Sequence, residues 1–301
     1  MTVTAPSPVT ADNAHLADEG RLIVEGSDRP AIVATVSTLL AEAGANIVSL
    51  DQYSTDPGGG RFFQRTVFQL QNLAVVRPEL EAVLDRELGD KLGLRWRLAE
   101  AARRKRVAIF ASKTDHCLLD LLWRQSHGEL DMQVEMVVSN HPDNAEAVRQ
   151  FGVPYVYVPV KNGDKKAAEQ EHLRLLNGNA DFVVLARYMQ IISGDFIRDV
   201  GVPIINIHHS FLPAFIGSGP YQKAKERGVK LIGATAHYVT EDLDEGPIIE
   251  QDVVRVSHAD STQDLVRRGA DVERLVLARA VAWHCQDRVV RDGNSTIVFG
   301  Q

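Results

Sequence analysis

The 301-residue sequence has little cysteine and no long apolar run. Its two cysteines, Cys117 and Cys285, are too few for a disulfide framework, and this usage is typical of a reducing compartment. No C-x-x-C pair or His/Cys cluster in the sequence suggests a zinc site, so no metal site is expected. No stretch is long and apolar enough to cross a bilayer, and the N-terminus lacks the basic and apolar regions of a secretory signal. These absences predict a cytoplasmic protein with no membrane partner.

An excess of positive charge is also missing. The chain carries 33 Lys and Arg against 40 Asp and Glu, a net charge of -7, which argues against nucleic acid as the main partner. Its 45% hydrophobic and 24% charged content is that of an ordinary globular protein. Because single cores seldom grow beyond about 250–300 residues, a chain of this length is expected to form two domains.

The N-terminal third predicts a small domain at residues 21–100, after a flexible leader at residues 1–20. Short apolar or alternating runs predict strands, and apolar residues at helical spacing predict helices. A proline is expected in the first turn of each helix, where its missing N–H would be unpaired anyway. The predicted strands are 22–24, 46–54, 62–70 and 94–98, and the predicted helices run from Pro30 towards Gly44 and from Pro78 to Leu88. This βαββαβ order is that of a ferredoxin-like sandwich.

This segment resembles the ACT domains, which often bind amino acids and associate with one another. The residues that carry the resemblance are Gly26-x-Asp28-Arg29-Pro30, Ile32-Val33-Ala34-x-Val36-Ser37-x-Leu39 and Gly44-x-Asn46-Ile47. The resemblance implies a homo-oligomer and an amino-acid effector that binds near Asp28, Asn46 and Ile47. Ala31 departs from the family pattern, which usually has glycine after the proline, so effector binding stays open.

Residues 101–106 are rich in arginine and lysine and predict a solvated basic linker rather than a nucleic-acid patch. Residues 107–301 then alternate apolar strands with helices, which indicates a doubly wound, mostly parallel sheet covered on both faces. The predicted strands are 107–110, 134–139, 153–159, 181–186 and 204–207, and the predicted helices are 118–124, 144–151, 165–176 and 262–287. Ligands of such sheets bind beyond the carboxyl ends of the strands, so the catalytic site is expected there.

Two polar side chains end one of these strands. Asn206 and His208 lie two residues apart, so both project to the same side of an extended chain. An amide and an imidazole placed in this way can stabilise the oxygen of a carbonyl group as its carbon becomes tetrahedral and the oxygen anionic. The pair also fits strand-end residues that bond to nearby backbone, and the motif alone leaves both interpretations open.

A second polar segment joins a strand at residues 233–239 to an acidic loop that ends in a Gly-Pro turn. Glu241, Asp242 and Asp244 crowd into four residues, which is also typical of a solvated loop. Asp244 stands just before the turn. Burial there would raise its pKa and a charged histidine nearby would lower it, and the sequence does not decide between the two.

Together the two segments resemble the folate-dependent formyltransferase family. The matching residues are Asn206-x-His208-x-Ser210-x-Leu212-Pro213 and His237-x-Val239-x(4)-Asp244-x-Gly246-Pro247. The resemblance implies that Asn206, His208 and Asp244 are catalytic. It also implies a substrate pocket that contains Met189, Gln190, Ile191, Ile192, His237 and Val239.

A closer resemblance, which extends over about residues 21–299, is to the formyltetrahydrofolate deformylases. It is carried by the ACT module and by His208-His209-Ser210-Phe211-Leu212-Pro213-Ala214-Phe215-Ile216-Gly217, Pro220-Tyr221 and residues 228–239. It implies hydrolysis of 10-formyltetrahydrofolate to formate and tetrahydrofolate, with folate as the substrate and no cofactor. The formate is then expected to supply purine synthesis and to balance the one-carbon pool.

Two other functions stay open. One is formyl transfer to an unidentified amine, and the other is a non-catalytic regulator that binds folate or an amino acid. The loop at residues 111–117 contains no glycine, and its Asp115 would repel a phosphate, so an amine acceptor that carries phosphate is disfavoured. Lys113 in the same loop still offers a charge for an anion. His209 is a secondary candidate that would favour water over an amine.

Overall fold

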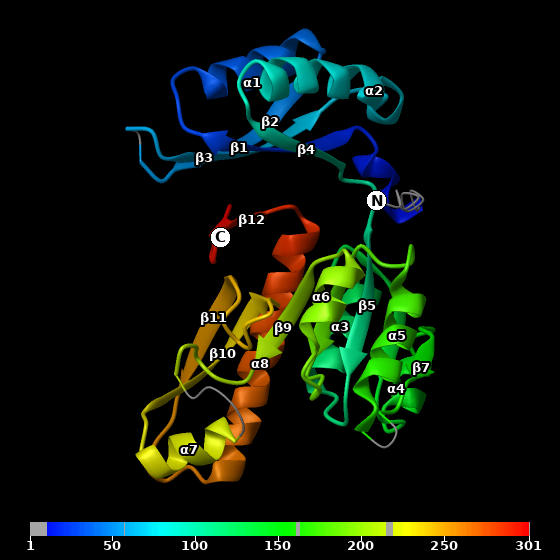
Figure 1. Ribbon diagram of the computed structural model, residues 1–301, viewed down its shortest axis with the longest axis vertical. Coiled ribbons are helices and arrows are strands. Elements are labelled where there is room, and N and C mark those ends of the chain that lie inside the picture. The colour runs from blue at the N-terminus through cyan, green and yellow to red at the C-terminus, as the bar shows by residue number, and fades with distance from the viewer. Residues whose placement is uncertain (1–10, 57, 161–162, 215–218, 301) are drawn as a thin grey trace. The chain divides into compact units, whose positions relative to one another are not determined.

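A computed structural model describes residues 11–56, 58–160, 163–214 and 219–300 (Figure 1). Contacts divide the chain into two compact units. The smaller unit contains residues 11–104, Gln286–Asp292 and residues 297–300, and the larger contains the described residues of Lys105–Cys285 with Gly293–Thr296. Within these described ranges, no helix is both long and apolar enough to cross a membrane.

The smaller unit is a four-stranded antiparallel sheet with two helices on one face (Figure 1). Its strand order is β2-β3-β1-β4. The elements are a 3-10 helix η1, Ala11–Leu16; β1, Glu19–Ser27; α1, Ile32–Glu42; β2, Asn46–Ser54; β3, Arg61–Gln69; α2, Leu73–Leu84; a π-helical extension η2, Asp85–Asp90; and β4, Arg95–Glu100. This arrangement confirms the predicted ferredoxin-like βαββαβ fold.

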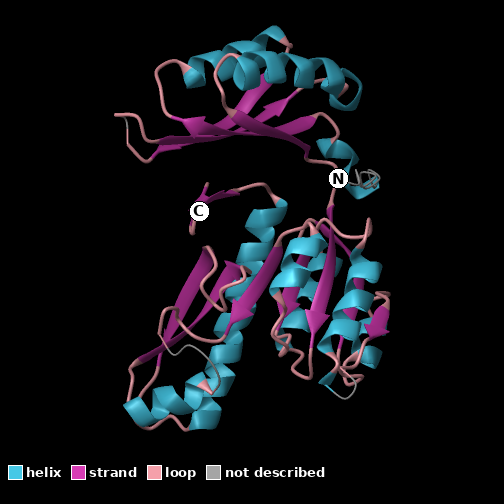
Figure 2. Cartoon of the chain, in the orientation of Figure 1, coloured by secondary structure: helices cyan, strands magenta, loops and turns pink. Residues whose placement is uncertain are grey.

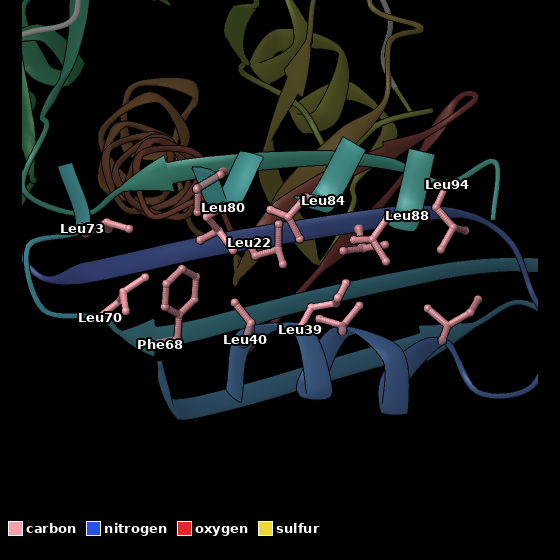
Figure 3. Close-up of a cluster of buried hydrophobic side chains, with 14 of the residues drawn as sticks. Leu22, Leu39, Leu40, Phe68, Leu70, Leu73, Leu80, Leu84, Leu88 and Leu94 are labelled. Carbon is pink, nitrogen blue, oxygen red and sulfur yellow. The ribbon is translucent and has the colours of Figure 1, made fainter. Parts of the chain in front are cut away.

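The apolar core of this unit lies between the sheet and the helices (Figure 3). Leu22 and Val24 of β1 face the helices because the side chains of a strand alternate between its two faces. Leu40 of α1 and Leu84 of α2 are fully buried in the same cluster, together with Phe68 of β3. Full burial of one such side chain contributes about 1.5–3 kcal/mol, so this layer holds both helices on the sheet.

Two predictions at the edges of this unit are wrong. Residues 11–20, expected to belong to a flexible leader, form the 3-10 helix and the start of β1. Residues 1–10 lie outside the described residues. The basic linker expected at residues 101–106 runs into strand β5, which begins at Lys105. Arg106 is held there because its backbone and side chain both bond to the carboxylate of Asp181.

The sequence predicts that Pro78 lies in the first turn of its helix, and this prediction is wrong. Pro78 lies inside α2. The helix begins earlier, at Leu73, whose side chain is fully buried in the core. Burial of that first turn outweighs the single backbone hydrogen bond that the proline removes.

Ala31, which precedes α1, has a φ of 71°, in the left-handed region. A Cβ in that conformation costs about 1–2 kcal/mol, while glycine adds entropy to the unfolded chain. Ala31→Gly should therefore raise the free energy of unfolding by about 0.5–1 kcal/mol in chemical denaturation. Ala34→Gly, inside the same helix, should lower it by about 1 kcal/mol. A loss of stability in Ala31→Gly would contradict this account.

The C-terminal segments complete the smaller unit, although the sequence assigns all of residues 107–301 to the second domain. An apolar cluster joins them to the sheet. Its buried members are Ile23, Phe63, Val290 and Phe299. Asp287 is 2% exposed and forms an ion pair with Arg97, and Arg65 donates to the backbone carbonyl of Asp287 at 3.2 Å. These contacts depend on residues far apart in sequence, which explains why local patterns did not reveal them.

The larger unit is built on a seven-stranded sheet in the order β11-β10-β9-β8-β5-β6-β7. The strands β9, β8, β5, β6 and β7 are parallel to their neighbours. Strand β10 pairs antiparallel with both β9 and β11. The strands are β5, Lys105–Ala111; β6, Met132–Ser139; β7, Tyr155–Tyr157; β8, Phe182–Ala186; β9, Ile204–His208; β10, Leu231–Tyr238; and β11, Ile248–Arg255. This confirms the predicted doubly wound, mostly parallel sheet.

Helices flank the strands of this sheet (Figure 2). They are α3, His116–Ser126; α4, Ala145–Arg149; α5, Lys165–Leu176; α6, Gly194–Val200; α7, Pro220–Arg227; and α8, Thr262–Cys285. Phe110 and Leu185 belong to an apolar cluster covered by α5 and α6. Ile109 and Val184 are equally buried and point to the other face, where α3 and α8 contact each other. Two short strands, β12, Val289–Asp292, and β13, Ser295–Val298, lie near the C-terminus.

His172 of α5 is buried among aromatic rings in the first of these layers. It meets Phe110, Tyr188 and Phe196 edge to face, at centroid distances of 4.8, 6.1 and 6.1 Å. Burial lowers the pKa of His172 to about 4, although the carboxylates of Glu169 and Glu171 oppose the shift. The ring is therefore neutral at neutral pH, and it acts as a packing residue.

The lowered pKa of His172 predicts a pH-dependent stability. In the unfolded chain its pKa is about 6.5, so between pH 6.5 and 4 the unfolded state binds a proton that the folded state does not. The free energy of unfolding should therefore fall as pH falls, by about 2 kcal/mol between pH 8 and pH 5 from this residue. His172→Phe should lose that part of the pH dependence, while exposed His127→Phe should keep it. Equal pH dependence in wild type and His172→Phe would refute the assignment.

Candidate active site

A cavity of about 390 Å³ opens at the carboxyl ends of β8 and β9, and the end of β10 and the loop at residues 239–244 also line it. The sequence assigns nine residues to catalysis or substrate binding, and all nine line this cavity. They are Met189, Gln190, Ile191, Ile192, Asn206, His208, His237, Val239 and Asp244. Residues 215–217 of the motif after β9 lie outside the described residues. The structure thus brings the two polar segments together, whereas the role of each residue stays a prediction.

A hydrogen bond between β9 and β10 orients Asn206. In their antiparallel pairing, His237 lies opposite Asn206, and Asn206 Nδ2 is 3.2 Å from His237 Nε2. His237 Nδ1 lies 3.0 Å from the backbone carbonyl of Tyr238. Because a carbonyl only accepts, Nδ1 carries the proton and Nε2 accepts from the Asn206 amide. Burial lowers the pKa of His237, in keeping with a neutral ring. Among the described residues, the bond to His237 is the one hydrogen bond found for the Asn206 amide nitrogen, so its second N–H can serve a ligand.

Asp244 lies against His208. Its Oδ2 is 3.3 Å from His208 Nδ1, and its Oδ1 is 3.9 Å from His237 Nε2. Burial alone would raise the pKa of the Asp244 carboxyl, but the hydrogen bond to His208 and the Coulombic attraction of that ring outweigh it and lower the pKa. Asp244 is therefore a carboxylate that holds the Nδ1 side of His208. On the other side of the ring, Nε2 is buried and has no hydrogen-bond partner among the described residues.

A close backbone contact fixes the loop that carries Asp244. The N–H of Tyr238 donates to the carbonyl of Pro247 at 2.9 Å. A Cβ added to Gly246 would lie 1.8 Å from the Tyr238 carbonyl oxygen, so only glycine allows this approach. Asp244 itself has a φ of 59°, a left-handed conformation that is costly for a side chain with a Cβ. The loop thus holds a strained residue with its carboxylate against His208.

The cavity also contains a charged residue to which the sequence assigned no role. Arg187 follows β8, lines the cavity and forms an ion pair with Glu273 of α8, whose side chain is 2% exposed. Burial and the charge of Arg187 lower the pKa of His209 to about 4, so that ring is neutral. In the sequence, Glu273 looks like any charged residue of an amphipathic helix, and no local signal pairs it with Arg187.

Among the described residues, His116, Cys117 and Glu273 form a group whose ligand atoms are close enough to share a metal ion. Burial raises the pKa of the Cys117 thiol well above its ordinary value, so the sulfur is a neutral thiol. The Glu273 carboxylate accepts from Tyr221 at 2.5 Å, lies 2.8 Å from His116 Nε2 and pairs with Arg187. These partners already balance its charge, and the guanidinium opposes a second cation.

The three residues expected to bind an effector lie in the smaller unit. The carboxylate of Asp28 accepts a hydrogen bond from Ser54, Asn46 is exposed at the start of β2, and Ile47 packs partly against the apolar core. Ile47 thus contributes to packing, whereas Asn46 is available to a ligand. Effector binding by these residues stays a prediction.

Comparison with known proteins places both units in families. Residues 105–281 match the Formyl transferase family, and residues 20–85 match the ACT domain family. A formyltetrahydrofolate deformylase from Mycobacterium bovis is 62% identical over 283 residues, which cover 94% of this chain and 91% of that protein. This chain belongs to the formyltetrahydrofolate deformylase family.

Solved structures agree with membership of the deformylase family. A formyltetrahydrofolate deformylase from Pseudomonas syringae pv. tomato has a TM-score of 0.87 and 45% identity, with 94% of both chains covered. Glycinamide ribonucleotide transformylase 1 from Symbiobacterium toebii is 30% identical, with a TM-score of 0.62, and covers 65% of this chain and 95% of its own. The family resemblance read from the sequence is therefore confirmed, and the deformylase fold is related to that of a transformylase.

Proposed function

We propose that this chain hydrolyses 10-formyltetrahydrofolate to formate and tetrahydrofolate. The observation that carries the proposal is the Nε2 atom of His208, which has no partner in the cavity wall while Asp244 holds Nδ1 of the same ring. An imidazole oriented in this way can accept a proton at Nε2 and return it. Membership of the deformylase family supports the same reaction.

The pterin is proposed to lie between residues 189–192 and the loop at residues 239–244. Met189 and Ile191 are 57% and 61% exposed on the cavity wall, and large apolar side chains so placed suit contact with a flat ring. The backbone N–H of Met189 donates to Ser112 Oγ at 2.9 Å, which fixes the start of this segment. The formyl carbon would then face Asn206 and His208.

Water is proposed to attack the formyl carbon while His208 Nε2 takes one of its protons. A bond forms between the water oxygen and the carbon, and the formyl oxygen becomes anionic. The free N–H of the Asn206 amide donates to that oxyanion. Asp244, whose pKa is lowered, keeps its charge and stabilises the imidazolium of His208.

The tetrahedral intermediate then collapses. The bond between the formyl carbon and N10 breaks, and N10 takes the proton that His208 Nε2 carries. Formic acid releases its remaining acidic proton and leaves as formate. Each atom of the water is thus accounted for, with one oxygen in formate, one proton on N10 and one proton released.

The tight contact at Gly246 gives a test of this geometry. Gly246→Ala should shift the loop of Asp244 and lower kcat by about 10²-fold, because displacements near 1 Å can cost that much. Gly89→Ala, where a Cβ would meet nothing within 4 Å, should leave kcat unchanged. Steady-state formate release by the two purified variants makes the comparison. A wild-type kcat in Gly246→Ala would show that catalysis does not depend on the close approach of Gly246 to the Tyr238 carbonyl.

The reaction class is tested with purified protein and 10-formyltetrahydrofolate in the absence of any amine. Stoichiometric formate and tetrahydrofolate are expected. Turnover that starts only when an amine is added, with a formamide as the product, would favour the formyltransferase alternative. Tight folate binding with no turnover would favour the regulator.

The wider role is also proposed from the chemistry of the product and from the ACT unit. Formate released here would supply purine synthesis in the cytoplasm and balance the one-carbon pool. An amino-acid effector would bind the smaller unit near Asp28 and Asn46, in a homo-oligomer. A change in formate release when single amino acids are added, lost in Asn46→Ala, is the expected result.

A further inference from the structure

Arg187 occupies an unusual position beside the proposed catalytic trio. It is the first residue after β8, with a φ of 61° in the left-handed region, and its side chain is 14% exposed. A non-glycine residue in this conformation costs about 1–3 kcal/mol and persists where the surroundings require it. Arg187 shares the cavity wall with Asn206, His208 and His209. The strained backbone thus places Arg187 in the wall of the cavity that the proposed catalytic trio also lines.

The guanidinium of Arg187 is charged but incompletely hydrogen-bonded. Its Nε is 3.5 Å from Glu273 Oε2, an ion pair without a hydrogen bond. Both Nε and Nη1 are buried and lack a hydrogen-bond partner among the described residues. Buried donors are nearly always bonded, because an unbonded one costs about 1–3 kcal/mol. These donors are therefore expected to meet a ligand group.

The Glu273 carboxylate has two other partners, so its pairing with Arg187 is only partial. Tyr221 donates to Glu273 Oε1 at 2.5 Å, and His116 Nε2 lies 2.8 Å from Oε2. The Tyr221 hydroxyl reaches this position because α8 has Gly269 there; a Cβ would lie 2.0 Å from the hydroxyl oxygen. Since the carboxylate is held by these two groups, Glu273 neutralises Arg187 in part while the guanidinium donors stay free.

The charge of the product indicates what Arg187 binds. Hydrolysis of the formyl group yields formate, a carboxylate, whereas transfer to an amine yields a neutral formamide. Arginine binds carboxylates through charge-assisted, often bidentate hydrogen bonds. We propose that Arg187 is the formate-binding residue of the site, which accepts the product carboxylate as the bond to N10 breaks. This inference rests on the proposed hydrolysis and deepens it.

Formate inhibition tests the proposal. Wild type should be inhibited by added sodium formate, and Arg187→Met, which keeps the length of the side chain, should raise the formate inhibition constant by at least about 10-fold. Glu273→Gln removes the internal counter-charge and should lower that constant below the wild-type value. Line broadening of ¹³C-formate by the full chain measures the same affinities without turnover. Lys223→Met, which removes an exposed cation of α7 outside this cavity wall, is the matched control and should not change them.

The opposite effects of the two variants separate a binding role from a structural one. General damage to the site would weaken formate binding in both, whereas the proposal requires weaker binding in Arg187→Met and tighter binding in Glu273→Gln. If Arg187→Met does not fold, the sign of the Glu273→Gln effect decides. An unchanged inhibition constant in Arg187→Met, or weaker binding in Glu273→Gln, would overturn the assignment of Arg187. Absence of formate release by wild type would instead overturn the proposed hydrolysis.

Discussion

Replacing His208 by alanine should lower kcat for formate release by about 10⁴-fold, because the variant loses both the proton acceptor and the proton donor of the reaction. Nε2 of this ring has no hydrogen-bond partner in the part of the chain that the structure describes, so the fold of that part does not depend on a hydrogen bond there. KM should change far less than kcat, since the proposed pterin contacts lie elsewhere on the cavity wall. Steady-state kinetics on the purified variant measures both constants.

Exogenous imidazole offers a second readout for His208→Ala. The substitution leaves a space in which a small imidazole can bind, so added imidazole should restore part of the lost turnover. Exposed His127→Ala serves as the control, with unchanged kcat and no response to imidazole. Turnover within tenfold of wild type in His208→Ala would remove this residue from the mechanism.

Asp244→Asn is expected to lower kcat by about 10³-fold while the fold is retained. The amide has the same shape as the carboxylate but no charge, so it no longer stabilises the imidazolium of His208 at the observed 3.3 Å contact. An amide can also donate to Nδ1, which would place the ring proton on Nε2 and block its role as a base. Rapid-quench measurement of a single turnover reports the chemical step directly.

Glu245→Gln is a matched control for Asp244→Asn. It removes the adjacent carboxylate of the same loop, which is exposed and lies outside the cavity wall. Its kcat should equal that of wild type. If both variants lose turnover equally, the charge of the loop as a whole matters, and the specific pairing of Asp244 with His208 is contradicted.

Regular periodicity made much of the fold predictable. The strand predicted at residues 46–54 and the helix predicted at residues 165–176 coincide with β2 and α5, because alternation and helical spacing are local properties of the sequence. Helix α7 and strand β11 were not predicted. α7 has few apolar residues and β11 is an edge strand with polar side chains, so neither shows a strong pattern.

The sequence predicts in part which residues come together in the cavity. The carboxyl ends of β8 and β9 meet at one edge of the sheet, which brings residues 189–192 close to Asn206 and His208. The place of Asp244 came from the family resemblance, since the left-handed φ that aims its carboxylate has no local sequence signal. No role was predicted for Arg187, because its partner Glu273 is brought to it only by the packing of α8.

The most direct test of water as the acceptor is turnover of 10-formyltetrahydrofolate in ¹⁸O-labelled water, without any amine, followed by mass analysis of the formate. The account predicts formate with one labelled oxygen and one oxygen from the substrate, in proportion to tetrahydrofolate formed. No formate, or formate free of label, would contradict it.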